Sequence, residues 1–132
     1  YFTESEHGWI EEYFLPTYLE PDHFLISGTK YVKKPIFGRE GDTVQIFDSS
    51  GSLFLEETQQ TYSNVPAIYQ QYSEMPVINF KSISGVQTGH QLIGSFLLNG
   101  QPSAVGFRVG GKITNNLSCY LPAGLAKGEG GL

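Results

Sequence analysis

Hydrophobic and polar residues alternate along most of the chain from His23 to Leu121. Successive side chains of a β-strand point to opposite faces, so a period of two is typical of strands with one buried face. Turn-forming residues such as Gly, Pro, Asn and Asp interrupt the alternation at the spacing found in β-sandwiches and barrels. The pattern predicts an all-β chain, an antiparallel β-sandwich or jelly roll with one or two short helices.

The alternation and its interruptions set the bounds of the expected strands. They cover residues 23–27, 29–37, 43–47, 52–56, 77–84, 91–98, 104–109 and 117–121. Pro35 lacks the N–H that an inner strand donates, so an edge strand or a bulge is expected there. Asn99-Gly100 suits the two positive φ angles of a type I′ turn and predicts a tight hairpin.

Two segments carry helical signals instead. Near the N-terminus, Thr3 and Glu6 fit a capping box, apolar residues follow at helical spacing, and Pro16 ends the segment. A short helix is expected there, with an aromatic-rich arm as the alternative. Pro66 is tolerated in a first helical turn, which predicts a second, connecting helix over residues 67–72.

The length of 132 residues matches one ordinary domain. The pattern contains neither an internal repeat nor a second hydrophobic core, so a single β domain over residues 1–132 is predicted. Within it, residues 1–20 form the N-terminal arm or helix. Residues 124–132 are rich in glycine and have no period, which is typical of a flexible tail.

The charge balance argues against a nucleic-acid partner. The net charge is −5 and the chain has only eight Lys and Arg residues, whereas a protein that binds phosphate backbones needs many cations. Lys30, Lys33 and Lys34 form a small cluster, interpreted here as the solvated face of a strand rather than a phosphate site. No apolar run reaches the length that crosses a bilayer, so membrane insertion is not expected.

Motifs of catalysis and metal binding are missing from the sequence. The chain contains no nucleophile elbow, no zinc-protease motif, no paired cysteines and no phosphate-binding P-loop. Cys119 is the only cysteine, and alternation places it on the apolar face of its strand, where a buried thiol is expected. His7, His23 and His90 do not have the spacing of metal ligands. No catalytic residue, cofactor or metal is predicted, and the chain is predicted not to be an enzyme.

The one unusual feature is an excess of aromatic residues, which make up 14% of the chain. Tyr and Trp combine an apolar ring with a polar tip and are common at interfaces and sugar-binding sites. The ordinary interpretation is that the N-terminal arm closes one end of the sheets. The alternative is a ligand or subunit interface built from Trp9, Tyr13, Phe14, Tyr18, Tyr62, Tyr69 and Tyr72.

These observations lead to a functional hypothesis for a non-enzymatic module. The chain is expected to be a structural or adhesive β module of a viral or phage appendage or a bacterial surface assembly, outside the cell or on the virion surface. It is expected to form a homo-oligomer or to bind other structural subunits, with the aromatic arm on the neighbouring subunit. A carbohydrate-binding module that binds a glycan is the alternative. A small hydrolase that uses His90 comes third.

Overall fold

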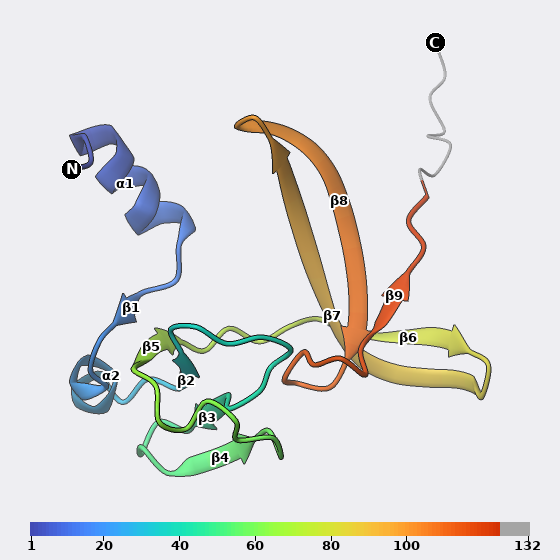
Figure 1. The fold of residues 1–132 in the computed structure, drawn as a ribbon, viewed down its shortest axis with the longest axis horizontal. Coiled ribbons are helices and arrows are strands. Elements are labelled where there is room, and N and C mark those ends of the chain that lie inside the picture. Colours follow the sequence, from blue (N-terminus) through green and yellow to red (C-terminus); the bar gives the residue numbers. More distant parts are fainter. Residues whose placement is uncertain (125–132) are drawn as a thin grey trace. The chain divides into compact units, whose positions relative to one another are not determined.

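The computed structural model describes residues 1–124, which divide into two compact units with a boundary between Glu74 and Met75. Each unit contains one antiparallel sheet (Figure 1). The prediction of a single domain stays a prediction. Residues 125–132 of the expected tail lie outside the described part of the chain.

The prediction of an all-β chain is confirmed: strands dominate and two short helices accompany them. The first unit contains helices α1 (Glu4–Tyr13) and α2 (Asp22–Ser27) and a sheet with the strand order β1-β5-β2-β3-β4. Its strands are β1 (Thr17–Tyr18), β2 (Tyr31–Pro35), β3 (Gln45–Phe47), β4 (Leu53–Glu56) and β5 (Ala67–Gln71). The second unit has the order β6-β7-β8-β9, with β6 (Val77–Ser82), β7 (Gly85–Leu98), β8 (Gln101–Gly110) and β9 (Cys119–Leu121).

Helix α1 confirms the expected N-terminal helix. The hydroxyl of Thr3 accepts a hydrogen bond from the backbone N–H of Glu6, and the Glu6 carboxylate accepts one from the N–H of Thr3. These bonds satisfy donors that the first helical turn otherwise leaves free. Phe14 leaves the helix two residues before Pro16. None of the residues of α1 is buried.

The strand expected over residues 23–27 is wrong, because helix α2 occupies this segment. Gly28 takes a left-handed conformation with φ of 61° and closes the last turn, so that Thr29 N–H donates to the Phe24 carbonyl. This one turn buries Phe24 against the sheet. A segment of six residues is too short for its apolar pattern to separate a helix from a strand.

The connecting helix expected over residues 67–72 is also wrong, because residues 67–71 form strand β5. β5 lies between β1 and β2 and pairs with β2 along its whole length, from Pro35 opposite Ala67 to Tyr31 opposite Gln71. The local helix signal of Pro66 was overridden by these long-range backbone hydrogen bonds.

Strand β2 confirms the core of the strand expected over residues 29–37, but the edge position is wrong. β2 lies in the interior of its sheet, between β5 and β3. Pro35 is tolerated because it is the last residue of β2 and lies beyond the pairing with β3, which ends at Lys33. The missing N–H therefore interrupts no inner ladder.

Aromatic rings form the core of the first unit. Phe24 of α2 stacks on Tyr31 of β2 with ring centroids 5.5 Å apart, and Tyr31 stacks on Phe47 of β3 at 4.9 Å. Tyr69 of β5 packs against Tyr31 at 6.0 Å, and Tyr18 of β1 meets Phe24 edge-on at 5.3 Å. Such offset and edge-on pairs add stability beyond the area that they bury.

The second unit is organised around the long β7–β8 hairpin (Figure 1). Asn99 and Gly100 have φ angles of 50° and 74°, which confirms the type I′ turn. Opposite each other in the hairpin lie Gly94 and Gly106, and the ring of Phe96 covers both. Beyond the reach of β6 and β9 the hairpin continues as a two-stranded ribbon with exposed apolar side chains.

Strand β9 corrects the expectation that Cys119 is buried. Cys119 pairs with Val109 on β8, and Val109 is 1% exposed. β9 is nevertheless the last strand of its sheet, and the cysteine is exposed. Alternation identified the face of the sheet correctly but could not show that this face lacks a cover at its edge.

Candidate functional site

The segment between β2 and β3, residues 36–44, has an irregular backbone and contains one cationic residue, Arg39, and two acidic residues, Glu40 and Asp42. Lys34 lies near the end of β2, and Arg39 follows in the segment itself. Together with Gly38, Glu40, Gly41 and Asp42, these residues line a hollow of about 220 Å³, so its lining contains two cationic side chains and two carboxylates. The hollow belongs entirely to the first unit.

Two successive turns shape this segment. Asp42 N–H donates to the Arg39 carbonyl, and Val44 N–H donates to the Gly41 carbonyl. Glu40, Gly41 and Thr43 have φ angles of 59°, 76° and 64°. Left-handed backbone is ordinary for Gly41 but unusual for Thr43, whose branched side chain makes it cost on the order of 1–3 kcal/mol. The surrounding structure must therefore hold Thr43 in place.

The turns leave consecutive backbone donors free. Among the described residues, the N–H groups of Gly38, Arg39, Glu40 and Gly41 donate to no other protein group. Successive N–H groups in a turn with left-handed residues form a concave, positively polarised surface that binds anions. Gly38 is required here for space, since a Cβ atom at this position would lie 2.5 Å from the ring of Pro35.

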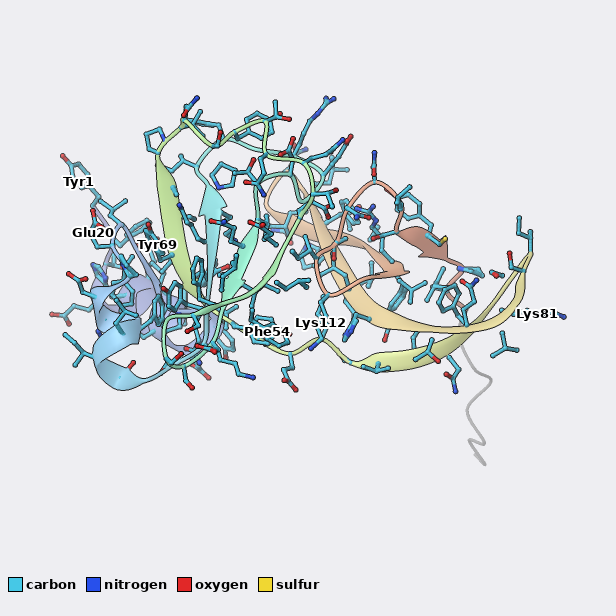
Figure 2. All side chains as sticks on the ribbon, turned by 90° about the horizontal axis from the view of Figure 1, so that it is seen from below. Tyr1, Glu20, Phe54, Tyr69, Lys81 and Lys112 are labelled. Atoms are coloured by element: carbon cyan, nitrogen blue, oxygen red, sulfur yellow. The ribbon has the colours of Figure 1, made fainter. Side chains whose placement is uncertain are left out.

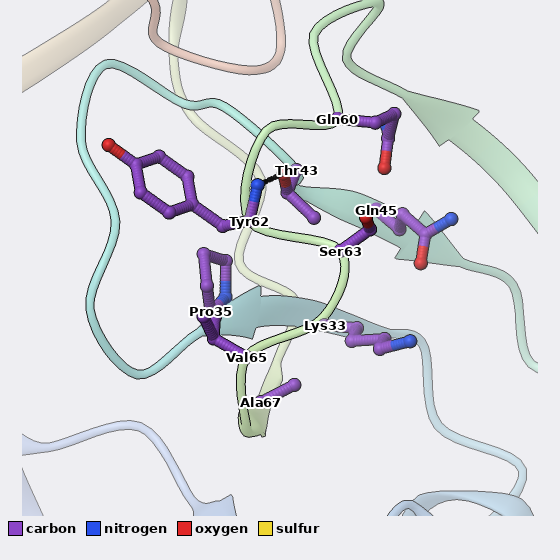
Figure 3. A pocket seen from close by; sticks show the side chains of 9 residues that line it. All are labelled: Lys33, Pro35, Thr43, Gln45, Gln60, Tyr62, Ser63, Val65 and Ala67. Atoms are coloured by element: carbon purple, nitrogen blue, oxygen red, sulfur yellow. Dashed lines mark hydrogen bonds between the residues drawn. The ribbon is translucent and has the colours of Figure 1, made fainter.

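Asp42 and Thr43 tie the segment to the loop that follows β4. Thr43 N–H donates to the Gln59 carbonyl at 2.9 Å, and the Thr43 hydroxyl accepts from Tyr62 N–H at 2.9 Å (Figure 3). The Asp42 carboxylate accepts from Thr61 N–H at 3.0 Å and from the Thr43 hydroxyl at 2.8 Å. Both Asp42 and Thr43 are 8% exposed.

These hydrogen bonds keep Asp42 ionised. The bond from the Thr61 hydroxyl is the largest cause that lowers the pKa of Asp42, burial opposes it, and bonds from Thr43 and the Thr61 backbone add to the lowering. The carboxylate therefore stays negatively charged while it accepts these hydrogen bonds.

Lys34 is half-buried and has unused donor capacity. Its ammonium donates to Oε1 of Gln70 at 2.7 Å, and Nε2 of Gln70 donates to the Thr17 hydroxyl at 2.8 Å. Burial lowers the pKa of Lys34 because it disfavours the charged form. An ammonium has three N–H donors. An anion beside Lys34 would use the free donors and offset the cost of burial.

Lys33 points to the opposite face of the sheet and lines a different pocket, of about 170 Å³. Figure 3 shows Lys33 and Gln45 extending to the same side from neighbouring strands, while the ring of Tyr62 lies beside Pro35. The two adjacent lysines therefore serve different surfaces, as the alternation of a strand requires.

Arg108 is a partly buried cation of the second unit. Arg108 on β8 donates from a terminal guanidinium nitrogen to the Asn115 carbonyl at 2.8 Å, and its guanidinium lies 5.3 Å from the ring centroid of Tyr120. The Nε atom of Arg108 is buried and has no hydrogen-bond partner. These contacts fix the side chain against β9.

The aromatic residues predicted to form an interface do not gather at one place. Trp9, Tyr13 and Phe14 are exposed on or just after α1. The other four lie along the first unit: Tyr18 and Tyr69 join the aromatic core, Tyr62 lines the Lys33 pocket and Tyr72 N–H donates to the Lys30 carbonyl. Figure 2 shows Tyr69 among the crowded side chains of this unit. A ligand or interface role for these seven residues stays a prediction.

Within residues 1–124 no three His, Cys, Asp or Glu side chains gather closely enough to hold a metal ion. In the same residues, neither helix has the length and apolar character needed to span a membrane.

A family model described as glutathionylspermidine synthase preATP-grasp matches residues 8–126. The match covers most of the chain and extends over parts of both compact units. The chain belongs to this family. Membership of the glutathionylspermidine synthase family overturns the hypothesis of a viral, adhesive or other non-enzymatic module, and with it the prediction that the chain is not an enzyme. The expectations about a homo-oligomer, a glycan and the location of the protein are not tested by this match.

The segment that carries the candidate site was not predicted from the sequence. Lys33 and Lys34 were interpreted, with Lys30, as the solvated face of a strand, and residues 38–42 fell between two expected strands. The available signal was the combination of a lysine at the end of a strand with Arg39 between two glycines. The phosphate loops with a recognised sequence motif lead into a helix, whereas this segment leads into strand β3.

Proposed function

We propose that the chain is part of an ATP-dependent synthase and that residues 34–42 bind a phosphate group of the nucleotide. The observation that carries this proposal is that Gly38, Arg39, Glu40 and Gly41, whose backbone N–H groups have no protein partner among the described residues, line the same hollow as Lys34. Backbone donors with a lysine and an arginine are the groups that recognise phosphate oxygens. The family description, preATP-grasp, associates the chain with a synthase that uses ATP, which makes the nucleotide the phosphate ligand that we propose.

The product in the family name suggests the reaction. Glutathionylspermidine joins glutathione, which has carboxylates, to spermidine, which has amines. To form an amide, the carboxylate oxygen attacks the γ-phosphorus of ATP and ADP leaves; the amine then attacks the acyl carbon and phosphate leaves. Such phosphoryl transfer depends on positioning and on cations that balance the phosphate charge. In this proposal, positive charge beside the phosphate groups of the nucleotide comes from Lys34 and Arg39, and the free N–H groups position the phosphate oxygens.

Calorimetric titration of the full protein with ATP tests the proposal. Lys34→Met removes the charge and keeps the length of the side chain, and it should weaken ATP binding about 10–100-fold, as expected for a lost charged hydrogen bond. The matched control is Lys81→Met, because Lys81 is an exposed lysine on strand β6 of the second unit (Figure 2). Equal affinities of the two variants, or a wild-type protein that does not bind ATP, would refute the proposal.

A further inference from the structure

The contacts of Asp42 and Thr43 suggest a role that the proposed phosphate site does not itself explain. Both residues stand at the end of the segment that carries the free N–H groups, just after Gly41. Their side chains bind the backbone of Thr61 and Tyr62 in the loop that follows β4. A carboxylate repels phosphate, so Asp42 is unsuited to be a ligand.

Asp42 and Thr43 each bind the backbone of the loop of residues 59–62, and we call this pair of contacts the clamp. Thr43 binds the second loop through both its backbone N–H and its hydroxyl, and Asp42 binds the adjacent N–H of Thr61. The Thr43 hydroxyl also donates a hydrogen bond to Oδ1 of Asp42 at 2.8 Å, which links the two residues of the clamp. Both side chains are buried. The clamp therefore fixes a left-handed Thr43 that an isolated chain would avoid.

We infer that Asp42 and Thr43 are positioning residues, which hold the Gly38–Gly41 donors in the arrangement that binds phosphate without touching it themselves. The inference rests on the proposed function of this segment. With the end at Asp42 and Thr43 fixed by these hydrogen bonds, the donors need less ordering when the anion arrives, and preorganisation of this kind strengthens binding.

Removal of one hydroxyl tests the clamp with little change of volume. In the full protein, Thr43→Val should weaken ATP binding about tenfold, since a buried hydrogen-bonded group loses its partner. Thr43→Ser keeps the hydroxyl and should bind ATP within about threefold of wild type. If the weaker binding of Thr43→Val came only from a change of side-chain volume, Thr43→Ser would not restore it. Thermal melting of each variant reports whether the fold is intact.

A milder variant covers the case in which Thr43→Val does not fold. Thr61 is exposed, and Thr61→Val removes only the hydroxyl that supports Asp42. This variant should fold and should bind ATP more weakly than Thr61→Ser. Wild-type ATP affinity in Thr61→Val, or in a folded Thr43→Val, would overturn the positioning role while leaving the phosphate site intact. Failure of the wild-type protein to bind ATP would instead overturn the proposed function.

Discussion

The β2–β3 segment and the β7–β8 hairpin are both strand connections with left-handed residues, yet they differ in what holds them. Gly41 and Gly100 have nearly equal φ angles of 76° and 74°. The hairpin turn follows from its own two residues and from the ladder beside it. The β2–β3 segment depends on Asp42 and Thr43, which need hydrogen bonds from a loop nineteen residues away. Regular turns stabilise the fold, whereas an irregular turn held by distant contacts can present free donors to a ligand.

The two units also differ in how they bury aromatic rings, and this difference predicts the largest effect. Phe24 is 2% exposed in the aromatic core, whereas Phe96 on the hairpin is 58% exposed. Phe24→Ala should lower the free energy of unfolding by about 3–5 kcal/mol, because it leaves a cavity. Phe96→Ala should cost only about 1 kcal/mol. Urea denaturation of both variants measures the contrast, and equal losses would show that the hairpin ring is covered in solution.

Valine at each of the two left-handed glycines separates fold from function. Gly41→Val and Gly100→Val should each lower the free energy of unfolding by about 1–3 kcal/mol, since a β-branched residue is strained at these φ angles. Only Gly41→Val should also weaken ATP binding. Denaturation and calorimetry on the same samples test the pair. If Gly100→Val weakens ATP binding as much as Gly41→Val does, the claim that only the β2–β3 segment takes part in ATP binding is wrong.

The pKa of Asp42 gives a pH test of the clamp. Because hydrogen bonds lower the folded-state pKa, the ionised carboxylate stabilises the folded state at pH values above the unfolded pKa of about 3.9. This contribution is lost as the pH falls through the lower, folded-state value. The stability difference between wild type and Asp42→Asn should therefore be constant from about pH 5 to 8 and shrink in stronger acid. A difference that grows on acidification would contradict the predicted direction.

The smallest expected effect concerns the single thiol on the second unit. Cys119 is exposed on edge strand β9, so a thiol reagent should label the native protein at a rate close to that of the unfolded chain. Cys119→Ser should leave the free energy of unfolding within about 0.5 kcal/mol of wild type. Slow native labelling would mean that another surface covers this strand.

Local sequence signals predicted the parts of the fold that local interactions determine. The Thr3–Glu6 capping box and the Asn99-Gly100 turn are satisfied by residues within a few positions of each other, and both were predicted. Segments 23–27 and 67–71 were assigned the wrong element. In the second of these, pairing with β2 outweighs the helix signal of Pro66, and no property of the segment alone reveals that partner.

The candidate site was harder to predict for the same reason. The sequence around Lys34 predicts a solvated lysine, because its hydrogen-bond partner, Gln70, lies thirty-six residues further along the chain. Thr43 carries no sequence signal for a left-handed conformation, because that conformation exists only through the bonds to Gln59 and Tyr62. The aromatic excess attracted attention because it is visible in composition, but two of its members, Tyr18 and Tyr69, are explained by the core.

Hydrogen exchange of backbone amides with and without ATP tests the central claim most directly. If the free N–H groups of residues 38–41 bind phosphate, saturating ATP should slow their exchange about tenfold or more, whereas exchange at Asn99 and Gly100 should stay unchanged. ATP that binds the protein but leaves exchange at residues 38–41 unaltered would contradict the account, because the nucleotide would then be held by other groups.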